Sequence, residues 1–560
     1  MKIALAQLNP TVGDLKANAE RITHAIARAR DRGADLVILP ELVICGYPPR
    51  DLLTVEGFVT RCADAARAVG ESATAGITAV IGTPLVRSDG NIANSLLVYR
   101  DNALADTYDK RLLPTYDVFD EDRYFEPGDR AVVIDVAGTR VGLAICEDLW
   151  RGEDAGFAAR YAHAPDPVAE LGKAGLDLLA VPSASPFVLG KHAAHRAILA
   201  KHARDLGVPV VSVNQCGGND DLVFDGRSCV LTPAGHTLAE GADFEEDLLV
   251  LDPFTAPPIR PPEIDPERLV IDALTVGVRD YLGKCGFKTA CLGLSGGIDS
   301  AIVAAIAVRA LGPDAVTGAT MPGPFSSPGS VTDAHALADN MAMRCVTMPI
   351  APAFDGHQSI LDHAFAELGL PALGEKLPDL AQENLQSRVR GALMMGISNR
   401  TGALLLTTGN KSELAVGYCT LYGDMNGGLA VISDVPKSMV FRVCRYMNDH
   451  HAELGFRVPP IPEATISKPP SAELAPGQLD TDSLPPYEIL DAIVERHVER
   501  RQSSQRITDE TGFDPDLVAR ICRLIDLNEY KRRQMAVGLK ITHAAFGPGR
   551  RMPIAQRWVR

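Results

Sequence analysis

The sequence lacks several features that would assign it to common classes of protein. No apolar run approaches the roughly 20 residues that a membrane-spanning helix needs, and AIVAAIAV at residues 301–308 is among the longest. The eleven cysteines include no CxxC pair and no regular spacing, which is typical of buried thiols in a reducing compartment. Because the opening MKIALAQLNP has no signal-peptide anatomy, we expect a cytoplasmic protein with no membrane partner.

A dominant positive charge is also missing. The chain has 55 Lys and Arg against 71 Asp and Glu, a formal net charge of −16, so we expect no nucleic-acid partner. The composition, 46% hydrophobic and 22% charged, is that of a globular protein. Because 560 residues exceed what one hydrophobic core serves, we expect at least two domains.

From residue 1 to about 250, short runs typical of β-strands alternate with helical patterns. Ile22, Ala25, Ile26 and Ala29 recur at helical spacing and predict one such helix. The strand-like runs are KIALAQL, DLVILP, AVIGTP, NSLLVYR, VGLAIC, DLLAVP and PVVSVNQ. This alternation predicts a layered α/β domain.

Six prolines lie between Pro253 and Pro266, and such a stretch cannot continue a helix. We therefore predict a first domain at residues 1–252, a linker at 253–266 and a second domain at 267–560.

The second domain begins with patterns of a doubly wound α/β unit with a parallel sheet. A helical pattern (LVIDALTVGVRDYLGKCG), a buried strand (KTACLGL) and a further helical pattern (DSAIVAAIAVRALG) follow one another. Residues 459–486 are rich in proline and lack periodicity, which predicts either a lid or a disordered loop.

Cys146 ends an apolar strand in VGLAICEDLW. A lone cysteine there is more often a packing residue than a nucleophile. Glu147 and Asp148 follow it and would raise its thiol pKa, so a reactive thiolate would need a base and a cation from elsewhere. Glu41 and Lys110 lie at strand-to-loop transitions, where functional side chains are commonly displayed, although each alone is typical of a surface charge.

Together, the motifs LPELxxxGYP, KxxLPxYxxFDE and ICEDLW resemble the nitrilase superfamily, and specifically the glutaminase domain of glutamine-dependent NAD synthetases. The resemblance covers residues 1 to about 250 and implies an α-β-β-α sandwich. It implies that Glu41 is the general base, that Lys110 stabilises charge on the carbonyl oxygen, and that Cys146 forms a γ-glutamyl thioester.

The same resemblance implies that Tyr116, Ser185 and Lys191 hold the glutamine, although longer members of the family often carry arginine where Lys191 stands. Three histidines near Lys191 fall at helical spacings without a suitable carboxylate or cysteine partner. We interpret these histidines as a solvated helix face rather than a metal site: His192, His195 and His202.

LGLSGGIDSA follows a strand and opens a helix, so its glycines let backbone N–H groups face an anion. It lacks the GxxxxGK[ST] pattern and therefore the Walker lysine. SGGxDS resembles the PP-loop of the N-type ATP pyrophosphatases, which adenylate a substrate oxygen and release pyrophosphate, and whose fold is Rossmann-like. The ATP contacts that this resemblance implies are Gly293, Leu294, Ser295, Gly296, Gly297, Ile298, Asp299 and Ser300.

The hexapeptide alone fits NAD synthetases, GMP synthetases, asparagine synthetases and tRNA-thiolating enzymes. Three further segments, at residues 383–391, 407–437 and 529–540, resemble NAD synthetases. They are ENLQSRVRG, TTGNKSELAVGYCTLYGDMNGGLAVISDVPK and EYKRRQMAVGLK.

These segments imply that Thr408 contacts ATP and that Asn384, Glu413 and Lys531 contact deamido-NAD. Asp299 and Glu413 would hold Mg²⁺, which favours hard oxygen ligands. The run Lys531, Arg532 and Arg533 would concentrate positive charge for the dinucleotide phosphates in an otherwise acidic chain.

The resulting hypothesis is ATP-dependent amidation of deamido-NAD with ammonia from L-glutamine, by an enzyme that the family resemblance suggests is a homo-oligomer. Two alternatives stay open. One is a glutamine amidotransferase with another acceptor, and the other is a nitrilase-type amidase whose second domain only senses a nucleotide.

Overall fold

The computed structural model describes residues 1–153, 156–377 and 379–558. The chain divides into two compact units, Met1–Ile264 and Asp265–Arg560. The division falls within the proline-rich stretch. Among the residues that the structure describes, none of the helices combines the length and apolar composition that crossing a bilayer requires.

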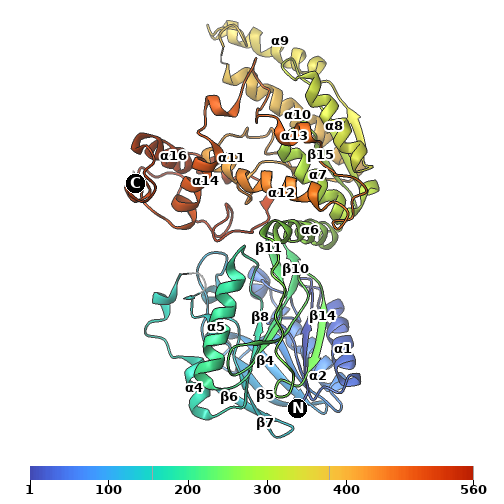
Figure 1. Ribbon diagram of the computed structural model, residues 1–560, viewed down its shortest axis with the longest axis vertical. Helices are drawn as coiled ribbons and strands as arrows, with labels where there is room; N and C mark the ends of the chain where they lie inside the picture. The colour runs from blue at the N-terminus through green and yellow to red at the C-terminus, as the bar shows by residue number, and fades with distance from the viewer. Residues whose placement is uncertain (154–155, 378, 559–560) are drawn as a thin grey trace. The chain divides into compact units, whose positions relative to one another are not determined.

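The first unit contains two mixed six-stranded sheets (Figure 1). In spatial order the first sheet is β14 (Asp247–Leu251), β1 (Ile3–Gln7), β2 (Leu36–Ile38), β3 (Thr78–Val86), β4 (Ile92–Arg100) and β5 (Ala103–Asp109). The second is β13 (Thr237–Glu240), β12 (Cys229–Leu231), β9 (Val210–Asn214), β8 (Leu178–Ser183), β7 (Thr139–Leu143) and β6 (Val132–Val136). The hairpin of β10 (Cys216–Asn219) and β11 (Leu222–Asp225) stands apart from both sheets.

The helices of this unit cover the outer faces of the sheets. They are α1 (Leu15–Asp31), α2 (Phe58–Ala73), α3 (Glu147–Trp150), α4 (Pro167–Ala174) and α5 (Lys191–Leu206). Because alternate strand residues face opposite sides, Ile3 and Leu5 join a core shared with the second sheet, whereas Ala4 and Ala6 pack with Ile22 of α1. Figure 1 shows α4 and α5 on the side of the strands opposite α1 and α2. The predicted α-β-β-α sandwich is confirmed.

The second unit contains one six-stranded sheet in which every pairing is parallel. Its spatial order is β17 (Arg344–Thr347), β16 (Val316–Thr320), β15 (Ala290–Gly293), β18 (Leu404–Thr407), β19 (Leu429–Ala430) and β20 (Val537–Gly538). The chain builds outward from β15 to β17 and then returns to the other side of β15, so the order reverses between β15 and β18. Ligands of doubly wound folds bind at the carboxyl ends of strands at such a switch point.

Twelve helices among the described residues of this unit surround the sheet. They are α6 (Pro266–Lys284), α7 (Ile298–Leu311), α8 (Pro328–Asn340), α9 (Ala351–Glu367), α10 (Leu380–Thr401), α11 (Lys411–Val416), α12 (Lys437–Asp449), α13 (Glu463–Ser467), α14 (Tyr487–Val494), α15 (Ser504–Thr511), α16 (Pro515–Leu527) and α17 (Glu529–Arg532). The apolar helix α7 is buried along most of its length. The predicted doubly wound fold is confirmed.

The proline-rich segment 459–486 contains α13 and a turn of 3₁₀ helix at Asp480–Asp482. Glu473 anchors it beside the first turn of α8. Its carboxylate accepts hydrogen bonds from the hydroxyls of Ser327 and Ser330 and pairs with Lys468 at 2.8 Å. The segment therefore lies against the helix that follows β16.

Candidate active sites

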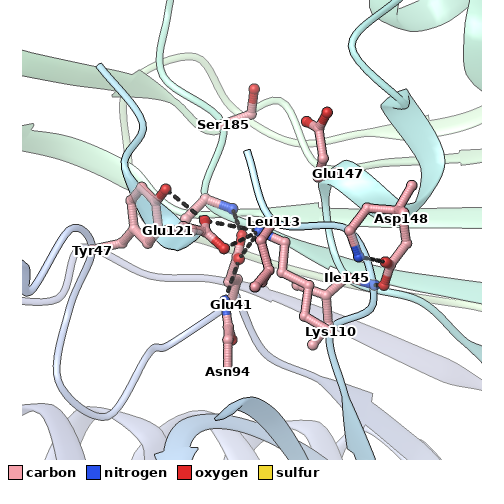
Figure 2. A network of polar contacts seen from close by, with 12 residues as sticks. Glu41, Tyr47, Asn94, Lys110, Leu113, Glu121, Ile145, Glu147, Asp148 and Ser185 are labelled. Carbon is pink, nitrogen blue, oxygen red and sulfur yellow. Dashed lines mark hydrogen bonds and ion pairs between the residues drawn. The ribbon is translucent and has the colours of Figure 1, made fainter. Parts of the chain in front are cut away.

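A buried lysine joins two carboxylates in the first unit. Lys110 follows β5, and its side chain is 0% exposed. Its Nζ lies 2.7 Å from Glu41 Oε1 and 2.8 Å from both carboxylate oxygens of Glu121 (Figure 2). Sequence reasoning gave Glu121 no role, although the motif KxxLPxYxxFDE ends on it. Burial raises the pKa of Glu121 to about 7, against the opposing effect of Lys110.

Glu41 is held by donors from two other strands. Asn94 on β4 donates to Glu41 Oε1 at 2.7 Å, and the backbone N–H of Ala184, just after β8, donates to Oε2 at 3.0 Å. Tyr47 donates its hydroxyl to Glu121 at 2.8 Å. Both carboxylates are therefore fixed in place, which general-base and electrostatic catalysis require.

Cys146 lies between β7 and the single-turn helix α3, with a backbone φ of +43°. The turn is held by buried Asp148, whose carboxylate accepts the N–H of Ile145 at 2.9 Å and the hydroxyl of Tyr108 at 2.6 Å. Burial raises the pKa of the Cys146 thiol well above its ordinary value, and Glu41 raises it further while Lys110 opposes.

The direction of this pKa shift agrees with the sequence analysis, but the cause differs. Glu147 contributes less than burial and Glu41. The resting thiol is therefore neutral and needs a base, and the carboxylate that most influences it is Glu41.

The three predicted glutamine contacts lie around this cluster. Tyr116 donates its hydroxyl to Glu147 at 2.8 Å, and Lys191 Nζ lies 3.5 Å from Ser185 Oγ. Figure 2 shows Ser185 and Glu147 pointing away from the bonded cluster of Lys110. Ser185 and Lys191 line one recess that is partly open to solvent.

The three histidines of α5 are not a solvated face, so that interpretation was wrong. His195 stacks on Trp150 with ring centroids 4.1 Å apart, and His202 lies 3.1 Å from the carbonyl oxygen of Leu149. His192 pairs with Glu240. The described part of the chain holds no cluster of three or more His, Cys, Asp or Glu residues suited to a metal ion.

In the second unit, the predicted phosphate loop joins β15 to α7. Gly296 has φ +75°, and a Cβ there would lie 2.4 Å from the backbone oxygen of Ser330, so only glycine fits. Ser295 donates its backbone N–H to Ser300 Oγ at 3.2 Å, which closes the loop. Within the described residues no side chain caps the N-terminus of α7. Such a terminus presents free N–H groups to an anion.

Thr408 and Glu413 lie beyond β18, the strand beside β15, so the switch point brings them to the same edge as the loop. Asn410 caps α11 through its Oδ1 and donates Nδ2 to Asp299 at 2.9 Å. This bond ties the phosphate loop to α11.

A second buried lysine joins the two predicted metal ligands. Lys437 Nζ lies 2.5 Å from Asp299 and 3.0 Å from Glu413. Burial raises the pKa of Glu413 to about 8, against the opposing effect of Lys437. Sequence reasoning gave Lys437 no role, although it is the last residue of the quoted segment 407–437.

The remaining predicted contacts gather around the loop that follows α11. Asn384 on α10 accepts the hydroxyl of Thr420 at 2.7 Å, and Lys531 Nζ donates to the carbonyl oxygens of Gly417 and Cys419 at 2.7 and 2.8 Å. A small hollow beside this loop is lined by residues that include Glu413.

Within the basic run at 531–533, Arg532 differs from its neighbours in being buried, while Arg533 is exposed. Arg532 is buried and donates to the carbonyl oxygens of Leu414 and Ala415 at the end of α11. It also pairs with Glu529. Arg532 therefore stabilises the C-terminus of α11.

Comparison with known proteins gives a family for each unit. A carbon-nitrogen hydrolase family model matches residues 2–252, and an NAD synthase model matches residues 270–535. The fold and the two sites thus define a class in which a carbon-nitrogen hydrolase unit is fused to an NAD synthase unit.

Full-length relatives narrow that class. The chain is 46% identical to a glutamine-dependent NAD⁺ synthetase of Synechocystis sp., covering 99% of this chain and 98% of the relative, and 38% identical to one of Thermotoga maritima, covering 100% and 99%. A solved glutamine-dependent NAD⁺ synthetase of Acinetobacter baumannii, in complex with ADP, is 37% identical with a TM-score of 0.76 and covers 99% of this chain and 98% of its own. The chain belongs to the glutamine-dependent NAD⁺ synthetases.

Proposed function

We propose that the first unit hydrolyses L-glutamine and that the second uses the ammonia to amidate deamido-NAD, consuming ATP and releasing AMP and pyrophosphate. The observation that carries this proposal is that each unit holds its own bonded cluster at the predicted motifs. These clusters are Glu41, Lys110 and Glu121 beside Cys146, and Asp299, Glu413 and Lys437 at the switch point.

In the glutaminase reaction, Glu41 takes the Cys146 proton and the thiolate attacks the amide carbon of glutamine. The Lys110 ammonium stabilises the negative charge that develops on the amide oxygen. Glu41 returns the proton as the carbon–nitrogen bond breaks, so ammonia leaves a γ-glutamyl thioester. Water, deprotonated by Glu41, then releases glutamate and restores the thiol.

In the synthetase reaction, the nicotinate carboxylate of deamido-NAD attacks the α-phosphorus of ATP, and the bond to the β-phosphate breaks. The N–H groups of the loop at 295–300 receive the phosphate charge. Ammonia attacks the acyl carbon, the carbon–oxygen bond to AMP breaks, and loss of a proton gives the amide of NAD.

Asp299 and Glu413 fit a role in holding Mg²⁺, because their carboxylates lie close enough together to share the single ammonium of Lys437. Mg²⁺ is commonly bound by one or two carboxylates together with substrate phosphates. When bound, it would neutralise charge on the ATP phosphates. Lys437 would then turn toward the phosphates, which its flexible side chain permits.

A cytoplasmic homo-oligomer is part of the same proposal and rests on the family alone. Light scattering of the purified chain tests the oligomeric part. A molar mass equal to one chain across the working concentration range would overturn it.

The test of function compares wild type with Cys146→Ala, using ATP, Mg²⁺ and deamido-NAD with either glutamine or an ammonium salt. We expect the variant to lose glutamine-driven NAD formation by about 10³-fold or more, because nothing replaces the nucleophile. Ammonia-driven NAD formation should persist. Cys62→Ala, at a buried thiol of α2, is the control and should keep both reactions. The two-site assignment would be contradicted if Cys146→Ala lost both reactions while Cys62→Ala kept them. It would also be contradicted if Cys146→Ala lost neither reaction.

A further inference from the structure

An aromatic ring faces the buried lysine of the second unit. Tyr487 is the first residue of α14, and the centroid of its ring lies 5.2 Å from Lys437 Nζ. That distance is within the range of a cation–π interaction, in which a ring face attracts a positive charge. The Lys437 ammonium therefore has two ionic partners, Asp299 and Glu413, and an aromatic face as a third neighbour.

The fold holds this ring in a fixed place. Asp491 lies one helical turn after Tyr487, on the same face of α14. Its carboxylate accepts the backbone N–H of Ser438, near the start of α12, at 2.9 Å, and it accepts the hydroxyl of Ser412 on α11. Since α11 supplies one carboxylate of the cluster and α12 begins at its lysine, these bonds fix α14 to both helices.

The hydroxyl of Tyr487 fixes the tilt of the ring. It donates to the carboxylate of Asp480 at 2.6 Å, and Asp480 is 4% exposed. Burial raises the pKa of Tyr487, and the charges of Glu413 and Asp480 raise it further. The phenol is therefore neutral and keeps its proton for this hydrogen bond. Because Asp480 belongs to segment 459–486, the bond also ties the ring to that segment.

A ring face and a carboxylate hold an ammonium in different ways. A carboxylate cancels the positive charge, whereas a ring attracts the cation through its quadrupole and adds no negative charge. An ammonium over the ring can therefore exchange its carboxylate partners for the phosphates of ATP without being left free. Its charge stays available to the phosphates while its position stays restricted.

We propose that Tyr487 is a positioning residue of the synthetase site, whose ring holds the Lys437 ammonium where it meets the phosphates of ATP. This inference rests on the proposed function of the second unit. Tyr487 acts through Lys437, so its ring contributes nothing where that lysine is absent. The hydroxyl contributes less than the ring, because it only orients it.

The first experiment separates the ring from the hydroxyl. Tyr487→Phe keeps the ring and removes the bond to Asp480, whereas Tyr487→Leu removes both. Ammonia-driven NAD formation gives kcat/KM for ATP in each variant. We expect Tyr487→Leu to lower it at least tenfold and Tyr487→Phe about two- to fivefold. Equal losses in the two variants, or no loss in Tyr487→Leu, would overturn the inference.

Tyr446→Leu is the matched control. Tyr446 lies on α12, and its ring stacks on His450 with centroids 4.1 Å apart. The control should keep kcat/KM for ATP within twofold of wild type. If it lost as much as Tyr487→Leu, removal of any ring in this region would be enough, and a specific role of Tyr487 would be excluded.

A double-mutant cycle tests whether the ring acts through the lysine. In the Lys437→Met background, Tyr487→Leu should lower kcat/KM for ATP less than twofold further, because the ammonium that the ring holds is gone. A merely structural role would instead multiply the two single losses. That result would show that Tyr487 acts independently of Lys437, and it would overturn the inference.

ATP binding without turnover gives a readout besides activity. Calorimetry with ATP and Mg²⁺, without deamido-NAD, should show at least tenfold weaker binding to Tyr487→Leu than to wild type. Tyr446→Leu should bind ATP as wild type does. Equal affinity of wild type and Tyr487→Leu would contradict a role of the ring in holding Lys437 for the phosphates.

Failure of the proposed function is distinguishable from failure of this inference. If wild type forms no NAD from ammonia, the proposed function of the second unit fails. If wild type forms NAD and Tyr487→Leu does so with unchanged kcat/KM for ATP, only the Tyr487 assignment fails. Thermal unfolding reports whether each variant is folded, and Tyr487→Met, which keeps bulk without a ring, replaces Tyr487→Leu if the latter is not.

Discussion

Both units place a buried lysine ammonium between two carboxylates, but they enclose it differently. In the first unit the side chains of Lys110, Glu41 and Glu121 are all at most 5% exposed. In the second, Lys437 is 2% exposed while Asp299 and Glu413 are 19% and 16% exposed.

Under the proposed function, the difference follows from what each site has to admit. A proton-transfer cluster gains from a closed, low-dielectric setting in which its charges are fixed. A site for ATP and a metal ion has to keep carboxylate oxygens within reach of both. Removing each lysine in turn should therefore give opposite patterns of activity and unequal costs in stability.

The largest expected effect comes from Lys110→Met. The change leaves two buried carboxylates without their cation, which typically costs about 3–5 kcal/mol of stability. Glutamine hydrolysis should fall at least 10³-fold while ammonia-driven NAD formation continues. Ammonia release and thermal unfolding measure the two effects. Lys201→Met, at an exposed pair with Asp205, should change neither.

Lys437→Met should show the reverse pattern of activity. NAD formation should fall about 10²-fold or more with either nitrogen donor, while glutamine hydrolysis persists. The loss of stability should be smaller than for Lys110→Met, because water reaches Asp299 and Glu413 in part. If the two lysine variants lost the same activity, the division of labour between the units would be wrong.

Glu121→Gln sharpens the comparison within the first unit, because it keeps the shape and removes one charge. Since the pKa of Glu121 is about 7, its ionised form builds up as pH rises through 7. We expect wild-type kcat/KM for glutamine to rise over that pH range. The variant should lack this rise, and its rate should be 10- to 100-fold lower. Glu121 acts through Lys110, so it is a positioning residue. A pH profile identical to that of wild type would show that its charge is not used.

Asp225 extends the comparison to a carboxylate with no lysine. Its folded pKa of about 6 lies above the value of 3.8 for an unperturbed Asp, so the folded unit loses stability as pH rises from about 4 to 6. Asp225→Asn should avoid that loss and be more stable than wild type at pH 7.5. The expected gain is about 1–2 kcal/mol, because water reaches part of the side chain and weakens the effect.

Thermal unfolding at pH 4.5 and 7.5 measures this difference. The gap between Asp225→Asn and wild type should widen at the higher pH by a few degrees. His192, Arg227 and Asp243 also face Asp225 and influence its pKa. Asp243→Asn should instead be destabilised, because it removes the carboxylate that pairs with Arg227. An equal gap at both pH values would contradict the assignment of the shift to Asp225.

The smallest effect is expected at Glu473→Gln. The pair of Glu473 with Lys468 is partly exposed, at 19% and 31%, and exposed pairs contribute about 1 kcal/mol or less. NAD formation should fall about two- to fivefold with both donors, and segment 468–478 should exchange amide hydrogens faster. Faster exchange in the first unit instead would contradict a local role.

The sequence predicted the folds well because period-2 and helical patterns are local. It singled out Glu41, Lys110 and Cys146 as candidates because each stands in a recognisable motif. Glu121 and Lys437 were overlooked as partners because their roles arise from contacts across 11 and 138 residues of chain, and no local pattern encodes such a contact.

The errors have a common physical origin. His195 was assigned to a solvated helix face because of its helical spacing, and Arg532 to a basic run that would meet the dinucleotide phosphates. In the fold, His195 stacks on Trp150 and Arg532 satisfies helix-end carbonyls. Polar side chains can therefore be buried when the fold supplies specific stacking or hydrogen-bonding partners. Only the tertiary structure determines which residues those partners are.

The positive φ of Cys146 also limits how this chain can change over evolutionary time. A residue with a Cβ held in that region costs of order 1–3 kcal/mol, and glycine would relieve it. The proposed nucleophile thus occupies a backbone position where a replacement that relieves strain, glycine, would also be inactivating. A lineage able to draw on free ammonia would then have a selective route toward the substitution Cys146→Gly whenever stability limits it.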